Sequence, residues 1–294
     1  LGQSSKNFMK TNKTVLVTGS TGGIGLEISK ILAEAGWNLI LLNRSPEKAE
    51  KQLDELKGSF PDQDFYSYTA NLMDLPDVAK AIEKIASNHS EISALYNVAG
   101  ILTDRRLTSE QGYEGHYAVN VLAPYFITQR LRKRLSAAST SSRKSVVVNF
   151  ASSAIMSVKK LAVSELTNPK EIGGLMGAYA KTKLAITIVS EFLNEELSDE
   201  GILTHAVDPG PTKTPMTGGG DGMPWIVSLL QPLLFKSPEG QAKKAVSAVD
   251  AGVSEGASGI YISEGKRKKA PAIVSDKEIQ MELRKLLEDQ IAEF

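Results

Sequence analysis

Short apolar runs rich in β-branched residues alternate with longer stretches in which apolar residues recur every three or four positions. This alternation constrains the fold more than any other feature, because strands that alternate with helices form parallel βαβ units. The predicted strands are Thr14–Thr18, Asn38–Leu42, Phe65–Thr69, Ala94–Val98, Val146–Phe150, Leu203–Val207 and Gly259–Ile262. We therefore expect an α/β protein with a doubly wound, seven-stranded parallel sheet and helices on both faces.

No linker or internal repeat divides the 294 residues, so we expect a single domain over residues 13–294, preceded by a flexible N-terminal segment or tag remnant over residues 1–12. The formal net charge is zero, which gives no overall field that would attract nucleic acid or an anionic membrane. The absence of cysteine excludes disulfides, thiolate catalysis and Cys-based zinc sites, and the three histidines are too scattered to suggest a metal site. No apolar run is long enough to span a bilayer, and we expect a cytoplasmic protein.

Glycines are concentrated between the first predicted strand and the helix after it, in the stretch TGSTGGIG. Gly19, Gly23 and Gly25 would let the backbone approach a ligand closely, and the N-terminus of the helix presents unpaired N–H groups to an anion. No Lys-Ser/Thr pair follows, which excludes a P-loop. The position between a strand and a helix favours a dinucleotide site over a simple tight turn.

The second predicted strand ends in Asn43 and Arg44, where many dinucleotide sites carry an acidic residue that binds the ribose hydroxyls. An acidic residue would repel a 2′-phosphate, whereas a guanidinium can pair with it through two hydrogen bonds. We therefore favour NADP(H) as the cofactor, with NAD(H) possible. The alternative is that Arg44 is a solvated surface residue.

Tyr179 and Lys183 are four positions apart in a long predicted helix, so they share one helical face. A free phenol has a pKa of about 10, and a nearby ammonium stabilises the phenolate and lowers that pKa. Tyr179 could then exchange a proton with a carbonyl or alcohol oxygen. The alternative is an exposed amphipathic pair.

Five motifs in chain order resemble the short-chain dehydrogenase/reductase family, over almost everything from Lys13 to about Ile262. They are TGSTGGIG (Thr18–Gly25), NVAG (Asn97–Gly100), NFASS (Asn149–Ser153), YAKTK (Tyr179–Lys183) and DPGPTKT (Asp208–Thr214). A long segment before YAKTK, the Asn–Arg ending of the second strand and the length after the PG motif resemble the retinol-dehydrogenase-like branch. The resemblance implies a Rossmann-like fold and an oxidoreductase. The long segment is interpreted either as a pocket wall or lid, or as a surface loop.

The resemblance also implies catalytic roles for Asn120, Ser152, Tyr179 and Lys183. Ser152, rather than its neighbour Ser153, would hydrogen-bond the substrate oxygen. Tyr179 would act as the general acid in reduction and as the base in oxidation, and Lys183 would bind the nicotinamide ribose. Asn120 would hold a water against the lysine, unless it serves helix packing or local strain.

The expected cofactor contacts follow from the same motifs. They are Gly19, Ser20, Thr21, Gly23, Ile24, Gly25, Asn43, Arg44, Asn71, Leu72, Asn97, Ala99, Gly100, Tyr179, Lys183, Pro209, Gly210, Thr212 and Thr214. Two positions depart from the family pattern: Val98 replaces an asparagine, which bears on packing, and Asn71 replaces an aspartate near the adenine. Asn71 can still hydrogen-bond there, and Asp74 is a nearby alternative.

The predicted substrate loop, at about 215–237, is rich in Met, Leu and Trp, which suggests a hydrophobic substrate or, alternatively, a core or subunit-contact helix. A C-terminal helix is expected at about 275–293, after a basic run interpreted as a solvated turn. The leading hypothesis is an NADP-dependent oxidoreductase that interconverts a ketone or aldehyde and an alcohol. The alternatives are a non-catalytic dinucleotide sensor or scaffold and a carbon–carbon double-bond reductase. The resemblance implies a homo-oligomer (dimer or tetramer), and no nucleic-acid partner, membrane span or metal is expected.

Overall fold

The structure is a computed structural model that describes residues 13–212 and 236–294. The expected N-terminal segment (residues 1–12), Thr214 and nearly all of the expected substrate loop (about 215–237) lie outside the described residues.

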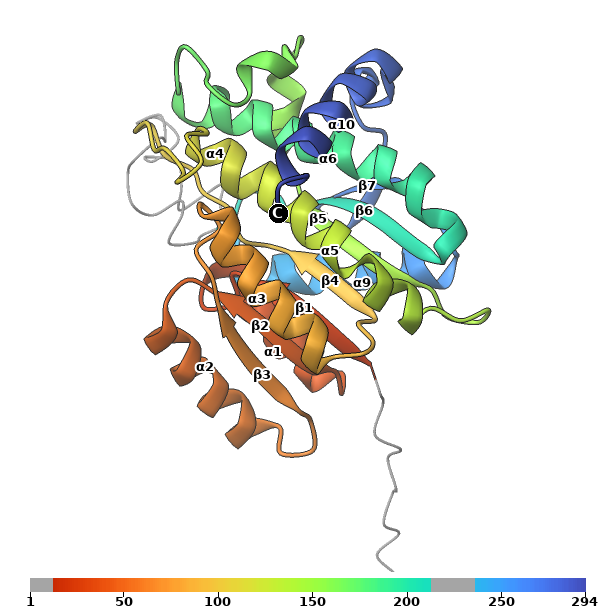
Figure 1. Cartoon of the computed structure of the whole chain (residues 1–294). Coiled ribbons are helices and arrows are strands. Elements are labelled where there is room, and N and C mark those ends of the chain that lie inside the picture. Colours follow the sequence, from red (N-terminus) through yellow and green to blue (C-terminus); the bar gives the residue numbers. More distant parts are fainter. Residues whose placement is uncertain (1–12, 213–235) are drawn as a thin grey trace, which may run out of the picture.

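An eight-stranded sheet forms the centre of the fold, with the strand order β3-β2-β1-β4-β5-β6-β7-β8 (Figure 1). The strands are β1 (Thr14–Thr18), β2 (Asn38–Asn43), β3 (Phe65–Thr69), β4 (Ala94–Asn97), β5 (Ser145–Phe150), β6 (Ile202–Asp208), β7 (Ile260–Ser263) and β8 (Lys266–Lys268). The strands from β1 to β7 are all parallel. The strand order reverses between β1 and β4, and α/β sheets bind ligands beyond the carboxyl ends of the strands at such a point. The predicted fold class is confirmed.

The sheet has one strand more than the seven predicted, because the chain turns back after β7. Ser263 pairs with Lys266 across a two-residue loop, in which Glu264 and Gly265 have φ values of 52° and 79°. Positive φ at both positions is typical of a type I′ hairpin turn, which places β8 antiparallel at the sheet edge. The basic run expected to be a solvated turn is therefore an exposed edge strand, where lysines discourage pairing with another chain.

Helices cover both faces of the sheet. The α-helices are α1 (Gly23–Glu34), α2 (Pro46–Ser59), α3 (Leu75–Asn88), α4 (Gly115–Tyr117), α5 (Ala123–Ala138), α6 (Ala178–Leu197), α9 (Pro238–Ser254) and α10 (Lys277–Ile291). The shorter helical turns are η1 (Ala118–Leu122), η2 (Ser153–Ser157), η3 (Val163–Glu165), η4 (Gly174–Met176), η5 (Ser198–Glu200) and η6 (Ala272–Ser275). The buried side chains of α1, α2 and α9 join one hydrophobic cluster, and those of α3, α5, α6 and α10 join a second cluster on the opposite face.

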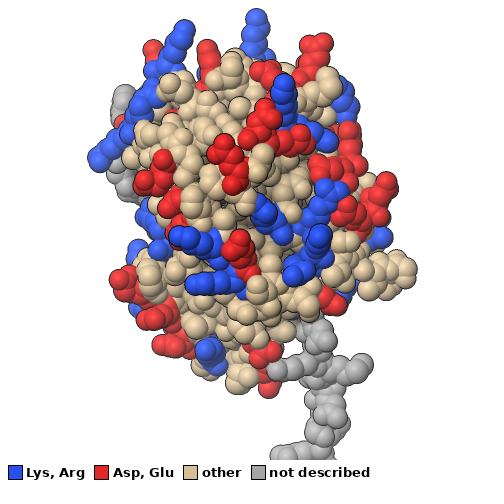
Figure 2. Space-filling view, in the orientation of Figure 1, with Lys and Arg blue, Asp and Glu red and all other residues tan. Residues whose placement is uncertain are grey.

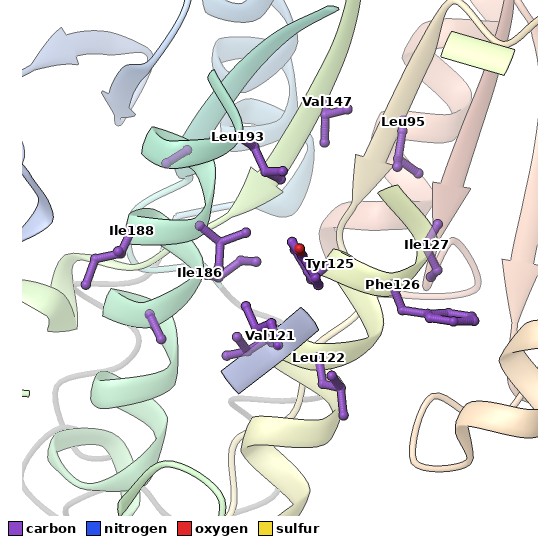
Figure 3. Packing of buried hydrophobic residues seen from close by; sticks show 14 of the residues in the cluster. Leu95, Val121, Leu122, Tyr125, Phe126, Ile127, Val147, Ile186, Ile188 and Leu193 are labelled. Atoms are coloured by element: carbon purple, nitrogen blue, oxygen red, sulfur yellow. The ribbon is translucent and has the colours of Figure 1, made fainter. Parts of the chain in front are cut away.

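In the larger cluster, apolar side chains of the strands pack against apolar side chains of the helices (Figure 3). Leu95 and Val147 project from neighbouring strands toward Tyr125 of α5 and Leu193 of α6, and all four side chains are buried. Full burial of one such side chain contributes about 1.5–3 kcal/mol. This packing fixes α6, which carries Tyr179 and Lys183, against the sheet.

The long segment between β5 and α6 is built into the same core. Leu161, Val163 and Leu166 are buried, and they belong to the cluster that α5 and α6 form with the sheet. The segment is also held from outside, because the Arg106 guanidinium donates to Asn168 Oδ1 and to the main-chain oxygens at 169 and 170. These contacts favour a fixed wall over a freely solvated loop.

The C-terminal helix α10 lies where a helix was expected, and it packs on α6. Leu283 and Leu287 are buried, and the Arg284 guanidinium lies 4.8 Å from the centre of the Phe192 ring of α6. Figure 1 shows α10 in front of α6. Helix α10 therefore covers part of the surface of α6.

The face of the molecule in Figure 2 carries Lys and Arg side chains interspersed with Asp and Glu side chains. No helix in the described ranges is long and apolar enough to cross a membrane.

Candidate active site

Four of the predicted motifs meet at one edge of the sheet. The glycine turn follows β1, the Asn97–Gly100 segment begins at the end of β4, Ser152 follows β5, and Pro209 and Gly210 follow β6. Since these neighbouring strands are parallel, their carboxyl ends lie at the same edge, beside the point where the strand order reverses.

The glycine turn is packed too closely for side chains at two of its positions. Gly19 has φ 68°, and a Cβ there would lie 2.8 Å from Ala99 Cα. A Cβ at Gly25 would lie 2.3 Å from the main-chain oxygen of Gly19. The N–H of Ala99 donates to Thr18 Oγ1 at 3.1 Å, which ties the turn to the segment after β4. Helix α1 then begins without a side-chain cap and without an acidic residue in its first turn.

Asn43 supports the glycine turn from within the protein. It is 3% exposed, its Oδ1 accepts from the N–H of Thr21 at 3.2 Å, and its Nδ2 donates to Ser20 Oγ at 2.8 Å. Gln52 of α2 completes the network. Its Nε2 donates to the main-chain oxygen of Ser20 at 2.8 Å, and its Oε1 accepts from the Ser20 hydroxyl at 2.8 Å. Gln52 is not among the predicted site residues, although a glutamine on the apolar side of an amphipathic helix is a usable signal. Arg44, by contrast, is exposed.

Ser152, Tyr179 and Lys183 form a compact group. Tyr179 is 8% exposed, and the Ser152 side chain lies close enough to the phenol to act on its pKa. The ammonium of Lys183 is buried, donates to the main-chain oxygen of Phe150 at 2.7 Å, and lies 5.8 Å from the centre of the Tyr179 ring. Ser152 also accepts the N–H of Ala154 at 3.2 Å, so its hydroxyl is positioned at the start of η2.

Burial moves both pKa values away from their ordinary values. It raises the pKa of Tyr179 to about 12, while the neighbouring Ser152 side chain acts to lower this pKa and the negative charge of Asp208 adds a smaller upward contribution. It lowers the pKa of Lys183 to about 8, although Asp208 acts in the opposite direction. The net shift of the phenol pKa is therefore upward, because burial penalises the phenolate, and the expected lowering of this pKa by Lys183 stays a prediction.

Asp208 is a buried acidic residue that is not among the predicted site residues. It is 2% exposed, Oδ1 accepts from the N–H of Gly210 at 2.9 Å, and Oδ2 accepts from Ser263 Oγ at 2.9 Å. Along β6, Asp208 shares the sheet face of Ala206, which belongs to the cluster that includes α6. Its charge therefore acts on the face that carries Tyr179 and Lys183.

Asn120 lies in the π-helical turn η1 and is 2% exposed. Its Oδ1 accepts from the N–H of Ile101 at 2.9 Å, and its Nδ2 donates to the Ile101 oxygen at 3.1 Å and to Thr182 Oγ1 at 3.3 Å. A π-helical turn inside a helix often marks a functional position. These contacts show Asn120 holding the segment after β4, and its link to Lys183 through a water stays a prediction.

The remaining predicted cofactor residues shape the neighbouring loops. Asn71 Oδ1 accepts from the N–H of Met73 at 3.2 Å, while the Asn71 N–H donates to Asp77 at 2.8 Å. Asn97 Nδ2 donates to Asn149 Oδ1 at 2.9 Å, and the Oδ1 atom of Asn97 is buried without a hydrogen-bond partner in the described part of the chain. Thr212 Oγ1 donates to the Gly210 oxygen at 2.8 Å.

A family model described as short chain dehydrogenase matches residues 13–221 of the chain. Retinol dehydrogenase 13 of Homo sapiens is 29% identical over 265 residues, which cover 88% of this chain and 78% of that protein. The polyprenol dehydrogenase of Danio rerio is 27% identical over 284 residues, which cover 93% of this chain and 85% of that protein. These similarities support the predicted resemblance to the retinol-dehydrogenase-like branch.

Solved structures show the same fold. The Pseudomonas aeruginosa RhlG/NADP active-site complex superimposes with a TM-score of 0.68 at 22% identity, covering 86% of this chain and 95% of that one. A short-chain dehydrogenase from Sphingobium yanoikuyae in complex with NADPH gives 0.66 at 20% identity, covering 96% of each chain. With the family model matching most of the sequence, the chain belongs to the short-chain dehydrogenase family of oxidoreductases.

Proposed function

We propose that this protein is an NADP(H)-dependent oxidoreductase that interconverts a carbonyl group and an alcohol on a hydrophobic small molecule. The observation that carries the proposal is the group of Ser152, Tyr179 and Lys183, with Tyr179 and Lys183 buried, at the sheet edge where the glycine turn also lies. A phenol placed beside a serine hydroxyl and an ammonium suits proton exchange with a substrate oxygen.

The ends of β1 and β2 offer what a dinucleotide with a 2′-phosphate needs. The first N–H groups of α1 have no side-chain cap, so they are free to bind the pyrophosphate. Arg44 is exposed beside the turn, and a guanidinium pairs with a phosphate through two hydrogen bonds. Two relatives of the same fold were solved with NADP or NADPH, which supports this choice over NAD(H).

The chain's own residues divide the chemistry among them. When bound, NADP(H) supplies or accepts the hydride. In reduction, Tyr179 gives its phenolic proton to the oxygen of the carbonyl group, and in oxidation it takes the proton from the alcohol. Ser152 hydrogen-bonds the same oxygen and holds it next to the phenol. Lys183, anchored on the main-chain oxygen of Phe150, stabilises negative charge on the tyrosine oxygen.

The pKa of Tyr179 bears on the direction of the reaction. With a pKa raised to about 12, the phenol keeps its proton near neutral pH and is ready to act as an acid. Oxidation of an alcohol needs the phenolate, so we expect the rate of alcohol oxidation to rise as the pH is raised above neutral. We expect the rate of carbonyl reduction, which needs the protonated phenol, to be high already near neutral pH.

A hydrophobic substrate fits the side chains near this end of the sheet. Met156 of η2 and Met176 of η4 are 46% and 58% exposed, and both short helices contact each other and α6. Methionine side chains adapt to apolar ligands of varied shape. Two similar proteins are named for long apolar alcohols, retinol and polyprenol, which supports this substrate class.

The test is a turnover assay with NADPH and a panel of apolar aldehydes and ketones, for the wild type and Tyr179→Phe. We expect Tyr179→Phe to abolish turnover while NADPH still binds. The matched control is Tyr66→Phe, the same change at a half-exposed tyrosine on β3, which should leave turnover intact.

Three other outcomes would contradict the proposal. Turnover of the Tyr179→Phe variant at close to the wild-type rate would remove Tyr179 from the chemistry. Binding of NADPH without activity on the whole panel would favour a dinucleotide sensor or scaffold. A saturated carbonyl compound as the only product from an unsaturated substrate would indicate a carbon–carbon double-bond reductase.

A further inference from the structure

A histidine and a glutamate outside the four proposed catalytic residues lie buried beside the site. His116 and Glu114 are 0% and 3% exposed, and Glu114 Oε1 lies 2.8 Å from His116 Nδ1. On the other side of the ring, the main-chain N–H of Thr103 donates to His116 Nε2 at 3.2 Å. Because a main-chain N–H can only donate, Nε2 is the nitrogen without hydrogen, and Nδ1 carries the hydrogen that Glu114 accepts.

The second carboxylate oxygen of Glu114 is also occupied. Glu114 Oε2 accepts from the N–H of Tyr117 at 3.2 Å, at the start of α4. The carboxylate thus joins the His116 ring to the main chain of α4, which continues directly into η1 with Asn120. The N–H of Glu114 in turn donates to the Thr167 oxygen at 2.8 Å, which connects this corner to the long segment before α6.

The His116 ring contacts the ring of Tyr179. The two ring centres are 6.4 Å apart, and the planes meet at 75°, which is an edge-to-face contact. Tyr179 therefore has His116 and the ammonium of Lys183 beside its ring, and Ser152 at its hydroxyl. A change in the His116 ring would reach the phenol directly.

His116 and Asn120 also act together on the segment after β4. They are four positions apart, so their side chains leave the same side of the helical run. Asn120 holds both main-chain groups of Ile101, and His116 holds the N–H of Thr103. This stretch follows Asn97–Gly100, the segment expected to contact the cofactor.

We propose that Glu114 and His116 are positioning residues: they hold the Tyr179 ring and the segment Ile101–Thr103 in place for proton transfer, with His116 locked in its Nδ1–H tautomer. The inference rests on the proposed function of Tyr179 as the proton donor. Glu114 acts through His116, and His116 acts through Tyr179 and the segment after β4. A misplacement of about 1 Å in such a site can lower the rate about 100-fold.

The variant Glu114→Gln tests the pair with almost no change in volume. The two oxygens of Glu114 bind different donors, so glutamine can place its oxygen opposite the Tyr117 N–H or the His116 Nδ1–H and must place its NH2 group opposite the other. If the glutamine oxygen keeps the Tyr117 N–H, the glutamine NH2 group faces His116 Nδ1 and favours the Nε2–H tautomer of His116. The hydrogen on Nε2 then points at the Thr103 N–H, so two donors oppose each other and the hydrogen bond to Thr103 is lost. His116→Phe is the second variant, because it keeps an aromatic edge against Tyr179 but removes both nitrogens.

The matched control is His89→Phe. His89 also packs edge-on against tyrosine rings, at 4.6 Å from Tyr66 and 5.9 Å from Tyr68. It lies at the end of α3 just before β4 begins, so it is at the opposite end of the sheet from Ser152 and Tyr179. The change removes a hydrogen bond to Tyr68 and should affect stability alone.

Two measurements decide the proposal. In the first, kcat is determined per NADPH-binding site, so that loss of folded protein does not count as loss of rate. We expect Glu114→Gln and His116→Phe to lower kcat about 10- to 100-fold with NADPH affinity unchanged, and His89→Phe to leave kcat unchanged. In the second, nitrogen-15 NMR of the histidine rings gives the tautomer of each, which is tractable because the chain has three histidines.

The NMR measurement separates this inference from the proposed function. An Nε2–H or doubly protonated His116 in the wild type would overturn the inference even if the enzyme is fully active. So would wild-type kcat in a folded Glu114→Gln variant. If the wild type shows no turnover, the proposed function fails. The positioning role is then decided by the Tyr179 ring signals of carbon-13-labelled protein, which must shift in Glu114→Gln and not in His89→Phe.

Discussion

The ammonium nitrogen of Lys183 lies 5.8 Å from the centre of the Tyr179 ring, one turn further along α6. Burial disfavours the charged form of each, so the pKa of the phenol is raised to about 12 and that of the ammonium is lowered to about 8. The protonation of both side chains near neutral pH therefore depends on how deeply they are buried. Two of the predictions below follow from these shifts.

Lys183 should make stability depend on pH in a defined direction. Its pKa is about 8 when folded and 10.5 in the unfolded chain, so between these values the unfolded state binds more protons. Below pH 8 the folded protein carries the full penalty of a buried charge, and this penalty disappears as pH rises toward 10.5. The free energy of unfolding of the wild type, relative to Lys183→Met, should therefore increase over this range. Denaturant titrations at several pH values measure it, and a constant difference would contradict the assigned shift.

Asp208 should set the pH dependence of oxidation. Its negative charge raises the pKa of both Tyr179 and Lys183, so the neutral variant Asp208→Asn should lower both. The phenolate then forms more readily, and the rise of kcat for alcohol oxidation with pH should move to lower pH. The control is Asp250→Asn on α9, whose helix packs on the opposite face of the sheet. A profile that does not move in Asp208→Asn would show that Asp208 serves structure alone.

Arg44 should determine the choice between the two cofactors. A charge-assisted hydrogen bond contributes about 1.5–3 kcal/mol, so Arg44→Asp should weaken NADPH binding at least about 10-fold. NADH binding should be retained or improved, because a carboxylate suits ribose hydroxyls. Calorimetric titration of both cofactors provides the comparison, with Lys51→Asp, a charge reversal at an exposed position of α2, as the control. Equal NADPH affinity in Arg44→Asp would refute the 2′-phosphate assignment.

Gly25 should tolerate no side chain. The Cβ of Gly25→Ala would lie 2.3 Å from the Gly19 oxygen, so the turn or α1 must shift, which costs about 1–3 kcal/mol in a well-packed region. We expect a lower melting temperature and loss of NADPH binding. Gly58→Ala in α2 is the matched control, since its Cβ meets nothing within 4 Å and should stabilise the helix by about 0.5–1 kcal/mol. Normal NADPH binding by Gly25→Ala would contradict the close packing of the turn.

Much of the fold could be predicted because its signals are local. The alternation of strand and helix patterns placed seven parallel strands, and each of them lies within a few residues of its predicted position. The eighth strand was missed because β8 is a three-residue basic run with no apolar pattern, and it pairs with β7 through a hairpin turn that the sequence did not indicate. Glu264 has φ 52°, but glutamate is not one of the residue types that indicate such a turn in a sequence.

By itself, the sequence determined the residue types and spacings that local geometry converts into a site: the glycines between β1 and α1, and Tyr179 four positions before Lys183 on one helix. Only the tertiary structure decided how far each group is buried and what lies beside it. Asn43 turned inward to Ser20, the phenol pKa rose instead of falling, and His116 came to lie against Tyr179. The physical reason is that desolvation and contacts between residues far apart in the chain depend on how helices and strands pack, which no local pattern records.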